Sequence, residues 1–188
     1  MTLSDILLPT YVQMLGALSG WLGKARAQMP DGAADALLAA RLAPDMFPLA
    51  TQVRFACVQA QEGVFRLKGE AFPASLDALL NEARGAAERP GSLADAQARI
   101  DETVALVEAA ALEALDVNAG APIAHALPNG MVFDLTAERY ARDWALPQFY
   151  FHVMIAYAIL RNQGVELGKV DYVAHMFAYL RPGTMPTS

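Results

Sequence analysis

Four long stretches of this sequence carry apolar residues at intervals of three and four positions, and this spacing restricts the fold more than any other feature. Such spacing places apolar side chains along one face of an α-helix. The stripe of the first stretch consists of Tyr11, Met14, Leu15, Leu18, Trp21 and Leu22. Four helices with one apolar stripe each bury those stripes most simply against one another, as a bundle. The 188 residues suit a single domain over 1–188.

Capping and breaking signals set the expected ends of the helices. We expect the four long helices at 4–28, from 45–48 to 67, at 92–115 and at 136–164. Asp45 is expected to cap the second helix and Thr136 the last one, since a short polar side chain can accept a hydrogen bond from the first turn. Pro147 predicts a kink or a new cap, because proline removes one hydrogen bond and clashes with the preceding turn.

Side chains expected in the core follow from the same periodicity. In the second helix they are Val53, Cys57, Val64 and Phe65, with Phe47 ahead of them, and in the third Ile100, Val104, Val107, Ala111 and Leu115. A single cysteine, Cys57, cannot form an internal disulfide and is expected to behave as a small buried hydrophobe.

Three shorter segments surround these helices. Pro128-Asn129-Gly130 lies between 123–127 and 131–135 and predicts a tight turn in a small β-hairpin. Residues 75–90 predict an additional helix or an ordered loop. The segment 171–180 predicts a further helix capped by Asp171, after a turn that Gly168 permits.

Composition and charge exclude several classes of partner. The net charge of −6 is spread along the chain, so the clustered Lys and Arg of a nucleic-acid-binding surface are not seen. No window approaches roughly 20 uninterrupted apolar residues, and we expect no membrane-spanning helix. The first residues lack the basic start and apolar stretch of a signal peptide. We therefore expect a soluble, cytoplasmic protein without a nucleic-acid partner.

Two segments carry a family resemblance: ARLAPDMFPLATQVRFA at 40–56 and ALPQFYFHVMIAYAILRNQGVELGKVDY at 145–172. They resemble a bacterial domain-of-unknown-function family within the DinB/YfiT-like superfamily. The second segment is the more specific, because its Phe-His, Ala-Tyr, Leu-Arg, Asn-x-Gly and Gly-Lys-x-Asp elements follow the order of that family. The resemblance implies an all-α, DinB/YfiT-like four-helix bundle that forms a homodimer. The resemblance implies no reaction. We expect the β-hairpin before the last long helix to be an addition to the bundle.

The resemblance also directs attention to a metal position. Many DinB-like proteins hold a divalent metal with one histidine on the second helix and a His-x-x-x-His pair on the last. In this sequence the pair falls on Gln148 and His152, and the second helix offers Gln52 instead of a histidine. A carboxamide is a poor ligand for zinc or nickel. We expect no metal and no cofactor; a bound metal would use His152, Gln148 and Gln52, with Asp45 or Glu138 adding charge.

The candidate pocket residues each have a structural alternative. His152 could act as a general base, or it could be a core histidine bonded to Gln148, Gln52 or a tyrosine. Asp45 is either a helix cap or an acid at the pocket mouth. Tyr157 lies in the matching segment and forms an i, i+4 pair with Arg161, which suits packing or a ligand clamp.

Two other histidines lie outside this pattern. His125 on the hairpin and His175 on the tail are expected to be structural or surface residues, and His175 could pair with Asp171.

Three functional hypotheses follow. The first is a dimeric bundle that binds a small molecule without metal, or interacts with other proteins, and has a polar pocket around Asp45, Gln52, Gln148, His152 and Tyr157. The second is a DinB-like metal-dependent enzyme, a thiol-dependent transferase or a hydrolase, with an altered metal centre. The third is a pure interaction protein with a closed, dry interior.

Overall fold

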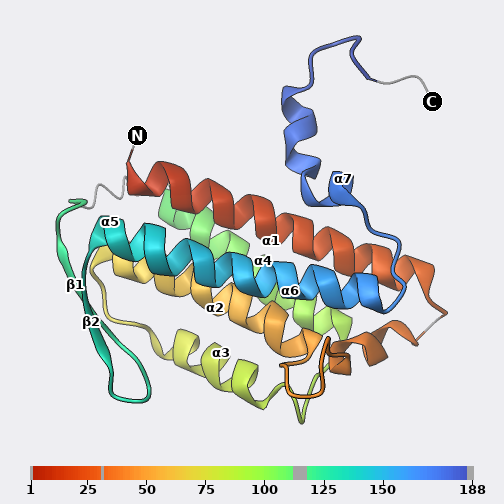
Figure 1. Ribbon diagram of the computed structural model, residues 1–188, viewed down its shortest axis with the longest axis horizontal. Coiled ribbons are helices and arrows are strands. Elements are labelled where there is room, and N and C mark those ends of the chain that lie inside the picture. The colour runs from red at the N-terminus through yellow and green to blue at the C-terminus, as the bar shows by residue number, and fades with distance from the viewer. Residues whose placement is uncertain (1, 31, 112–117, 186–188) are drawn as a thin grey trace.

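The computed structural model describes residues 2–30, 32–111 and 118–185, most of which are helical (Figure 1). The long helices are α1 (Leu3–Gln28), α2 (Leu49–Lys68), α4 (Leu93–Ala111) and α6 (Leu146–Asn162). The shorter ones are the 3-10 helix η1 (Ala34–Ala39), α3 (Ala74–Gly85), α5 (Ala137–Arg139), the π-helix η2 (Tyr140–Ala145), α7 (Lys169–Tyr172) and the 3-10 helix η3 (Ala174–Tyr179). The long helices lie along one another, which confirms the predicted all-α bundle.

Helix α2 lies at the centre of the bundle, with α3, α4 and α6 packed around it. Its buried residues are consecutive over 49–54 and again over 56–58, so no face of these turns is open to solvent. Val53, Cys57 and Val64 are buried as predicted, and Phe65 is half-buried. Polar side chains on such a helix need hydrogen-bond partners inside the protein.

The start of α2 differs from the prediction. The helix is capped by Pro48, whose backbone is extended, and no side chain caps it. Asp45 is exposed in the turn before the helix, where the Met46 amide donates to the Ala43 carbonyl (3.0 Å). Phe47, expected in the core, is 53% exposed because this turn carries it to the surface. The prediction that Asp45 caps α2 was therefore wrong.

Helices α1 and α4 each begin with a reciprocal side-chain cap. In α4 the Asp95 amide donates to the Ser92 hydroxyl (3.1 Å), and the Asp95 carboxylate accepts from the Ser92 amide (2.8 Å). Thr2 and Asp5 form the same reciprocal pair on α1, which therefore begins one residue earlier than expected. All six predicted stripe residues of α1 are buried.

The apolar face of α4 is partly displaced from the prediction. Ile100 and Val107 are buried and Val104 is half-buried, but Ala110 is buried in place of Ala111. Leu115 lies outside the described residues.

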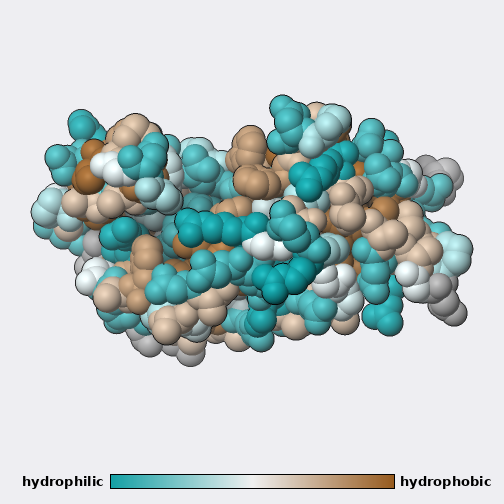
Figure 2. All heavy atoms as spheres, turned by 90° about the horizontal axis from the view of Figure 1, so that it is seen from below, coloured by the Kyte–Doolittle hydropathy of each residue, from teal (hydrophilic) through white to brown (hydrophobic). Residues whose placement is uncertain are grey.

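Residues 75–90 contain helix α3, which resolves the predicted alternative in favour of a helix. Leu76, Leu79 and Ala83 are buried on its inner side, against α2. The face of the molecule that carries α3 is mostly hydrophilic, with separate apolar areas (Figure 2). Helix α3 is thus an amphipathic cover on the central helix.

Pro147 breaks the predicted last helix into segments. Thr136 caps α5, as predicted, by accepting from the Arg139 amide (3.2 Å). The turns that follow are π-helical, and the Leu146 amide bonds to the Ala141 carbonyl, five residues back. A π-turn widens the helix where the proline ring would otherwise press on the preceding carbonyl. Helix α6 then starts with Pro147 in its first turn, where proline is tolerated.

The predicted hairpin is present. Strand β1 (Pro122–Ala126) pairs antiparallel with β2 (Val132–Thr136), and Ala126 opposes Val132. Gly130 has a φ of 87°, which favours glycine in the tight turn. Along β1, His125 is buried while both of its neighbours are exposed, so one face of the hairpin turns toward the bundle.

The tail departs from the predicted single helix. Asp171 lies in the first turn of α7 rather than at its cap, and its carboxylate accepts from the Gly168 amide (2.8 Å). Gly168 is extended, so the turn does not require a glycine there. Lys24 pairs with the Asp171 carboxylate, and the Trp21 indole donates to the Asp171 carbonyl (3.2 Å). These contacts fix the start of the tail on α1, and the chain beyond it projects from the bundle (Figure 1).

Within the described residues, no helix has both the length and the apolar character needed to cross a lipid bilayer.

Gly63→Ala should destabilise the protein. A Cβ at Gly63 would run into the hydroxyl of Tyr11, a fully buried side chain. Overpacking of this kind costs about 1–3 kcal/mol in free energy of unfolding, measurable by urea denaturation. Gly16→Ala is the control, since its Cβ would meet open space on the exposed side of α1 and should stabilise by about 0.5–1 kcal/mol. Equal stability of the two variants would contradict the close approach of Tyr11 to α2.

Candidate functional site

The structure brings Gln52 of α2 and His152 of α6 together inside the bundle. The Nδ1 atom of His152 lies 2.8 Å from the Gln52 Oε1 atom. The Gln52 Nε2 atom donates to the Phe47 carbonyl (3.3 Å), which orients the amide with its oxygen toward the imidazole. His152 therefore carries its proton on Nδ1 and donates it to Gln52. The Nε2 atom remains as an acceptor, and no described residue hydrogen-bonds to it.

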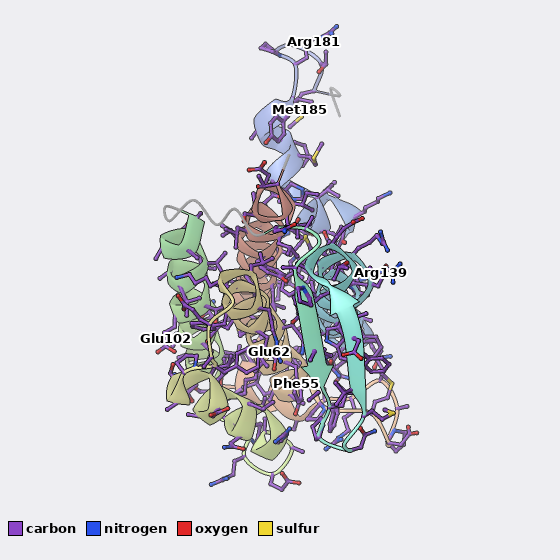
Figure 3. All side chains as sticks on the ribbon, turned by 90° about the vertical axis from the view of Figure 1, so that its left-hand side faces the viewer. Phe55, Glu62, Glu102, Arg139, Arg181 and Met185 are labelled. Atoms are coloured by element: carbon purple, nitrogen blue, oxygen red, sulfur yellow. The ribbon has the colours of Figure 1, made fainter. Side chains whose placement is uncertain are left out.

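Aromatic rings surround this imidazole. Phe55 stacks on it with the ring centroids 5.1 Å apart, and Phe151 meets it edge-on at 5.3 Å. Phe47 extends the row, with its centroid 6.0 Å from that of Phe55 (Phe55 is labelled in Figure 3). Phe47 and Phe151 are each 53% exposed and Met154 is 40% exposed. The hydrogen-bonded pair of His152 and Gln52 thus lies beside aromatic side chains that are partly exposed.

Burial changes the chemistry of His152. The side chain is nearly inaccessible, and burial lowers its pKa from 6.5 to about 4. The imidazole is neutral at pH 7 and its Nε2 atom is a hydrogen-bond acceptor. A general base works best when its pKa lies near the operating pH. This environment therefore favours binding over proton abstraction.

The other predicted pocket residues make no hydrogen bond to His152 in the described structure. Gln148 lies one turn earlier on α6 and is half-buried, with no hydrogen bond to a described residue. Asp45 is exposed in the loop before α2. Tyr157 packs edge-on against Trp21 of α1, with the ring centroids 5.1 Å apart. Of the five candidates, only Gln52 and His152 are hydrogen-bonded to each other.

A transition metal does not fit the donors present. The Gln52 oxygen bonds to the far nitrogen of His152, so it cannot also coordinate an ion at Nε2. Glu138 is on the surface and pairs with Arg142 (2.9 Å). Among the residues that the structure describes, no group of three His, Cys, Asp or Glu side chains is placed to hold a metal ion. One imidazole and a half-buried amide make a weak site for zinc or nickel.

Other chemically notable residues are structural in their surroundings. Burial raises the pKa of the Cys57 thiol to about 12, so the thiolate needed for nucleophilic attack is not formed at neutral pH. His175 is half-buried and does not bond to Asp171, whose carboxylate is occupied by Lys24 and Gly168. His125 is buried, not at the surface.

The aromatic flanks of His152 were missed in the sequence. Phe55 lies three residues after Gln52, so it shares a helical face with the predicted pocket residue. The spacing of Gln52 and Phe55 could therefore have indicated an aromatic ring beside the predicted pocket residue. Nothing in the sequence indicated that Phe47 would lie at the surface beside Phe55.

The fold and the His152 position define a DinB-like helical bundle. The chain belongs to the family described as "Domain of unknown function (DUF1993)", whose model matches residues 3–173. It is also similar to the crystal structure of a DinB family member protein from Shewanella denitrificans, with 30% sequence identity and a TM-score of 0.71. That similarity covers 98% of this chain and 96% of the other. The predicted family is confirmed. No curated protein matches this chain.

The lowered pKa of His152 predicts a pH dependence of stability. The unfolded chain takes up a proton near pH 6.5 and the folded protein near pH 4, so stability is fully present above pH 6.5 and is lost as the pH falls toward 4. Urea denaturation should show a loss of up to about 1.4 kcal/mol per pH unit in this window, absent in His152→Asn. Parallel pH profiles of the two proteins would show that His152 is not buried as described.

Proposed function

We propose that this protein binds a small molecule, without metal, on the apolar surface above His152. The observation that carries the proposal is the neutral imidazole, whose Nδ1 proton is donated to Gln52 while Nε2 has no hydrogen-bond partner among the described residues. The surrounding side chains are an amide and aromatic rings, which supply neither a nucleophile nor a proton donor. Binding is therefore better supported than catalysis.

The same geometry indicates the class of ligand. A single acceptor among aromatic rings suits a flat, largely apolar molecule with one hydroxyl or amine donor. The rings of Phe47 and Phe151 would contact its apolar body, and the donor would bond to Nε2 of His152. An anion is disfavoured, since no positive charge contacts the imidazole in the described structure.

Phenol is the simplest probe of this proposal. It should bind more tightly than toluene by a factor of about 3–10, the net contribution of one hydrogen bond. Titrations followed by 15N NMR of the histidine rings should shift the His152 Nε2 resonance. The His152→Phe variant should lose the preference for phenol, whereas His175→Phe should keep it. A phenol preference that survives in His152→Phe would contradict the assignment.

We further propose that the protein forms a homodimer through its C-terminal tail. The side chains of Met176, Phe177, Tyr179 and Leu180 are 40–75% exposed. They lie on a segment that extends away from the bundle (Figure 1). Exposed apolar side chains grouped in this way are typical of protein contact surfaces. A second copy of the chain would cover them.

Replacing Phe177 and Leu180 together by Asp should convert the dimer to a monomer, because it places two charges in the apolar contact. Sedimentation velocity measures the change, and circular dichroism checks that the bundle remains folded. Phe151→Asp is the comparison, since Phe151 is an exposed aromatic on α6. A wild-type monomer would contradict the proposal, as would a dimer lost only in Phe151→Asp.

A further inference from the structure

Most of the buried polar side-chain atoms without a partner lie around the end of α2 nearest the hairpin. Elsewhere on α2, Arg54 pairs with Glu82 (2.6 Å) and Gln61 donates to Thr103 (2.9 Å). Several buried polar atoms around the second half of α2 have no hydrogen-bond partner. They are the hydroxyls of Tyr11 and Tyr140, Gln59 Oε1, Arg66 Nε, both ring nitrogens of His125 and Trp144 Nε1. Thr51 and His175 are the exceptions located elsewhere. Buried polar groups nearly always have a partner, so this concentration requires one.

These groups belong to one cluster. The His125 ring lies 4.4 Å from that of Trp144 and 5.4 Å from that of Tyr140, centroid to centroid. Burial raises the pKa of Tyr140, the charge of Glu62 raises it further, and Arg66 opposes both. Burial also lowers the pKa of His125, and Arg66 lowers it further. Arg66 and Glu62 therefore lie close to Tyr140, beside the His125 and Trp144 rings.

A groove opens on the surface beside this cluster, and Arg66 belongs to both. The groove has a volume of about 560 Å³ and runs between the last turn of α2 and strand β1. Arg66, Gly69, Ile123, Ala124 and Ala137 are among its lining residues. Figure 3 looks onto this end of the molecule, with Glu62 on α2 and the hairpin beside it. The groove is large enough for a small organic molecule.

Among the described residues, two cations line the groove, Arg66 and Lys68, and Arg66 is the one whose charge acts on Tyr140 and His125. Its guanidinium lies over the Phe72 ring at 4.6 Å, and its Nε atom is buried without an acceptor. No carboxylate forms an ion pair with it in the described structure. A guanidinium in this state is suited to bind a planar carboxylate.

We propose that the groove binds a small molecule through its carboxylate, which accepts hydrogen bonds from Arg66 and from the Tyr140 hydroxyl. Ile123 and Ala124, which line the groove, would contact the rest of the molecule, and the His125 and Trp144 rings adjoin Tyr140. One guanidinium and neutral donors match a single negative charge, and Glu62 and Glu70 nearby disfavour a dianion such as phosphate. Burial raises the pKa of Glu62 to about 7, so it retains much of its proton at neutral pH and repels a monoanion less.

Benzoate is a suitable probe, and Trp144 a suitable reporter. Sodium benzoate should change the tryptophan fluorescence of the wild-type protein and bind measurably by calorimetry. The fluorescence change should vanish in Trp144→Phe, which retains Trp21. Arg66→Met should weaken benzoate binding by at least about tenfold, the effect of losing a charge-assisted hydrogen bond. Tyr140→Phe should weaken it by about 3–10-fold. Circular dichroism establishes that each variant is folded.

Three controls separate this site from simpler explanations. Arg142→Met removes an exposed cation on η2 and should leave benzoate binding unchanged. Benzyl alcohol, the neutral analogue, and inorganic phosphate should each bind at least about tenfold more weakly than benzoate. The proposal would be overturned if wild type bound no benzoate, which would assign the cluster to buried water. It would equally be overturned by unchanged binding in Arg66→Met and Tyr140→Phe, or by phosphate binding as tightly as benzoate.

Discussion

The burial of α2 is the constraint on which the rest of this structure depends. Because consecutive residues of this helix are enclosed, a polar side chain on it is stabilised only where a neighbouring element supplies a hydrogen-bond partner. Arg54 is matched by Glu82 of α3 and Gln61 by Thr103 of α4. Gln52 is matched by His152 of α6. These pairs fix the rotation of α2 against its neighbours, since a shift of either helix would leave a buried polar group unsatisfied.

The Gln52–His152 pair fixes both the tautomer and the orientation of an imidazole inside the bundle. The Gln52 amide oxygen on α2 accepts from Nδ1 and sets the tautomer of His152. Burial then keeps the ring neutral. The result is an acceptor held in a fixed orientation below exposed aromatic rings, which are properties of a binding surface.

Pro147 has an effect well beyond its own turn. The π-helical segment that accommodates it contains Tyr140 and Trp144, whose polar atoms are buried without partners. The hairpin brings His125 against the same rings. Such π-turns often occur at functional sites, and here the local break places aromatic and polar groups beside the open end of α2.

The local features of this fold could be predicted from the sequence. The stripe of α1, the Ser92 and Thr136 caps, the turn at Gly130 and the disruption at Pro147 all depend on interactions within a few residues. The Asp45 cap was predicted wrongly, because the backbone of the preceding turn moves Asp45 away from the helix. Residues 112–117, where the predicted third helix would end, lie outside the described structure.

The sequence by itself thus determined the helices, the hairpin and the resemblance to DinB-like bundles. Only the tertiary structure decided which polar groups meet. Gln52 and His152 are 100 residues apart, and their contact depends on the relative rotation of two helices. Helical periodicity restricts that rotation only to the width of an apolar stripe. The same limit applies to Arg66. Whether its guanidinium meets an acceptor depends on the side chains of every element packed around it, which the spacing along α2 does not reveal.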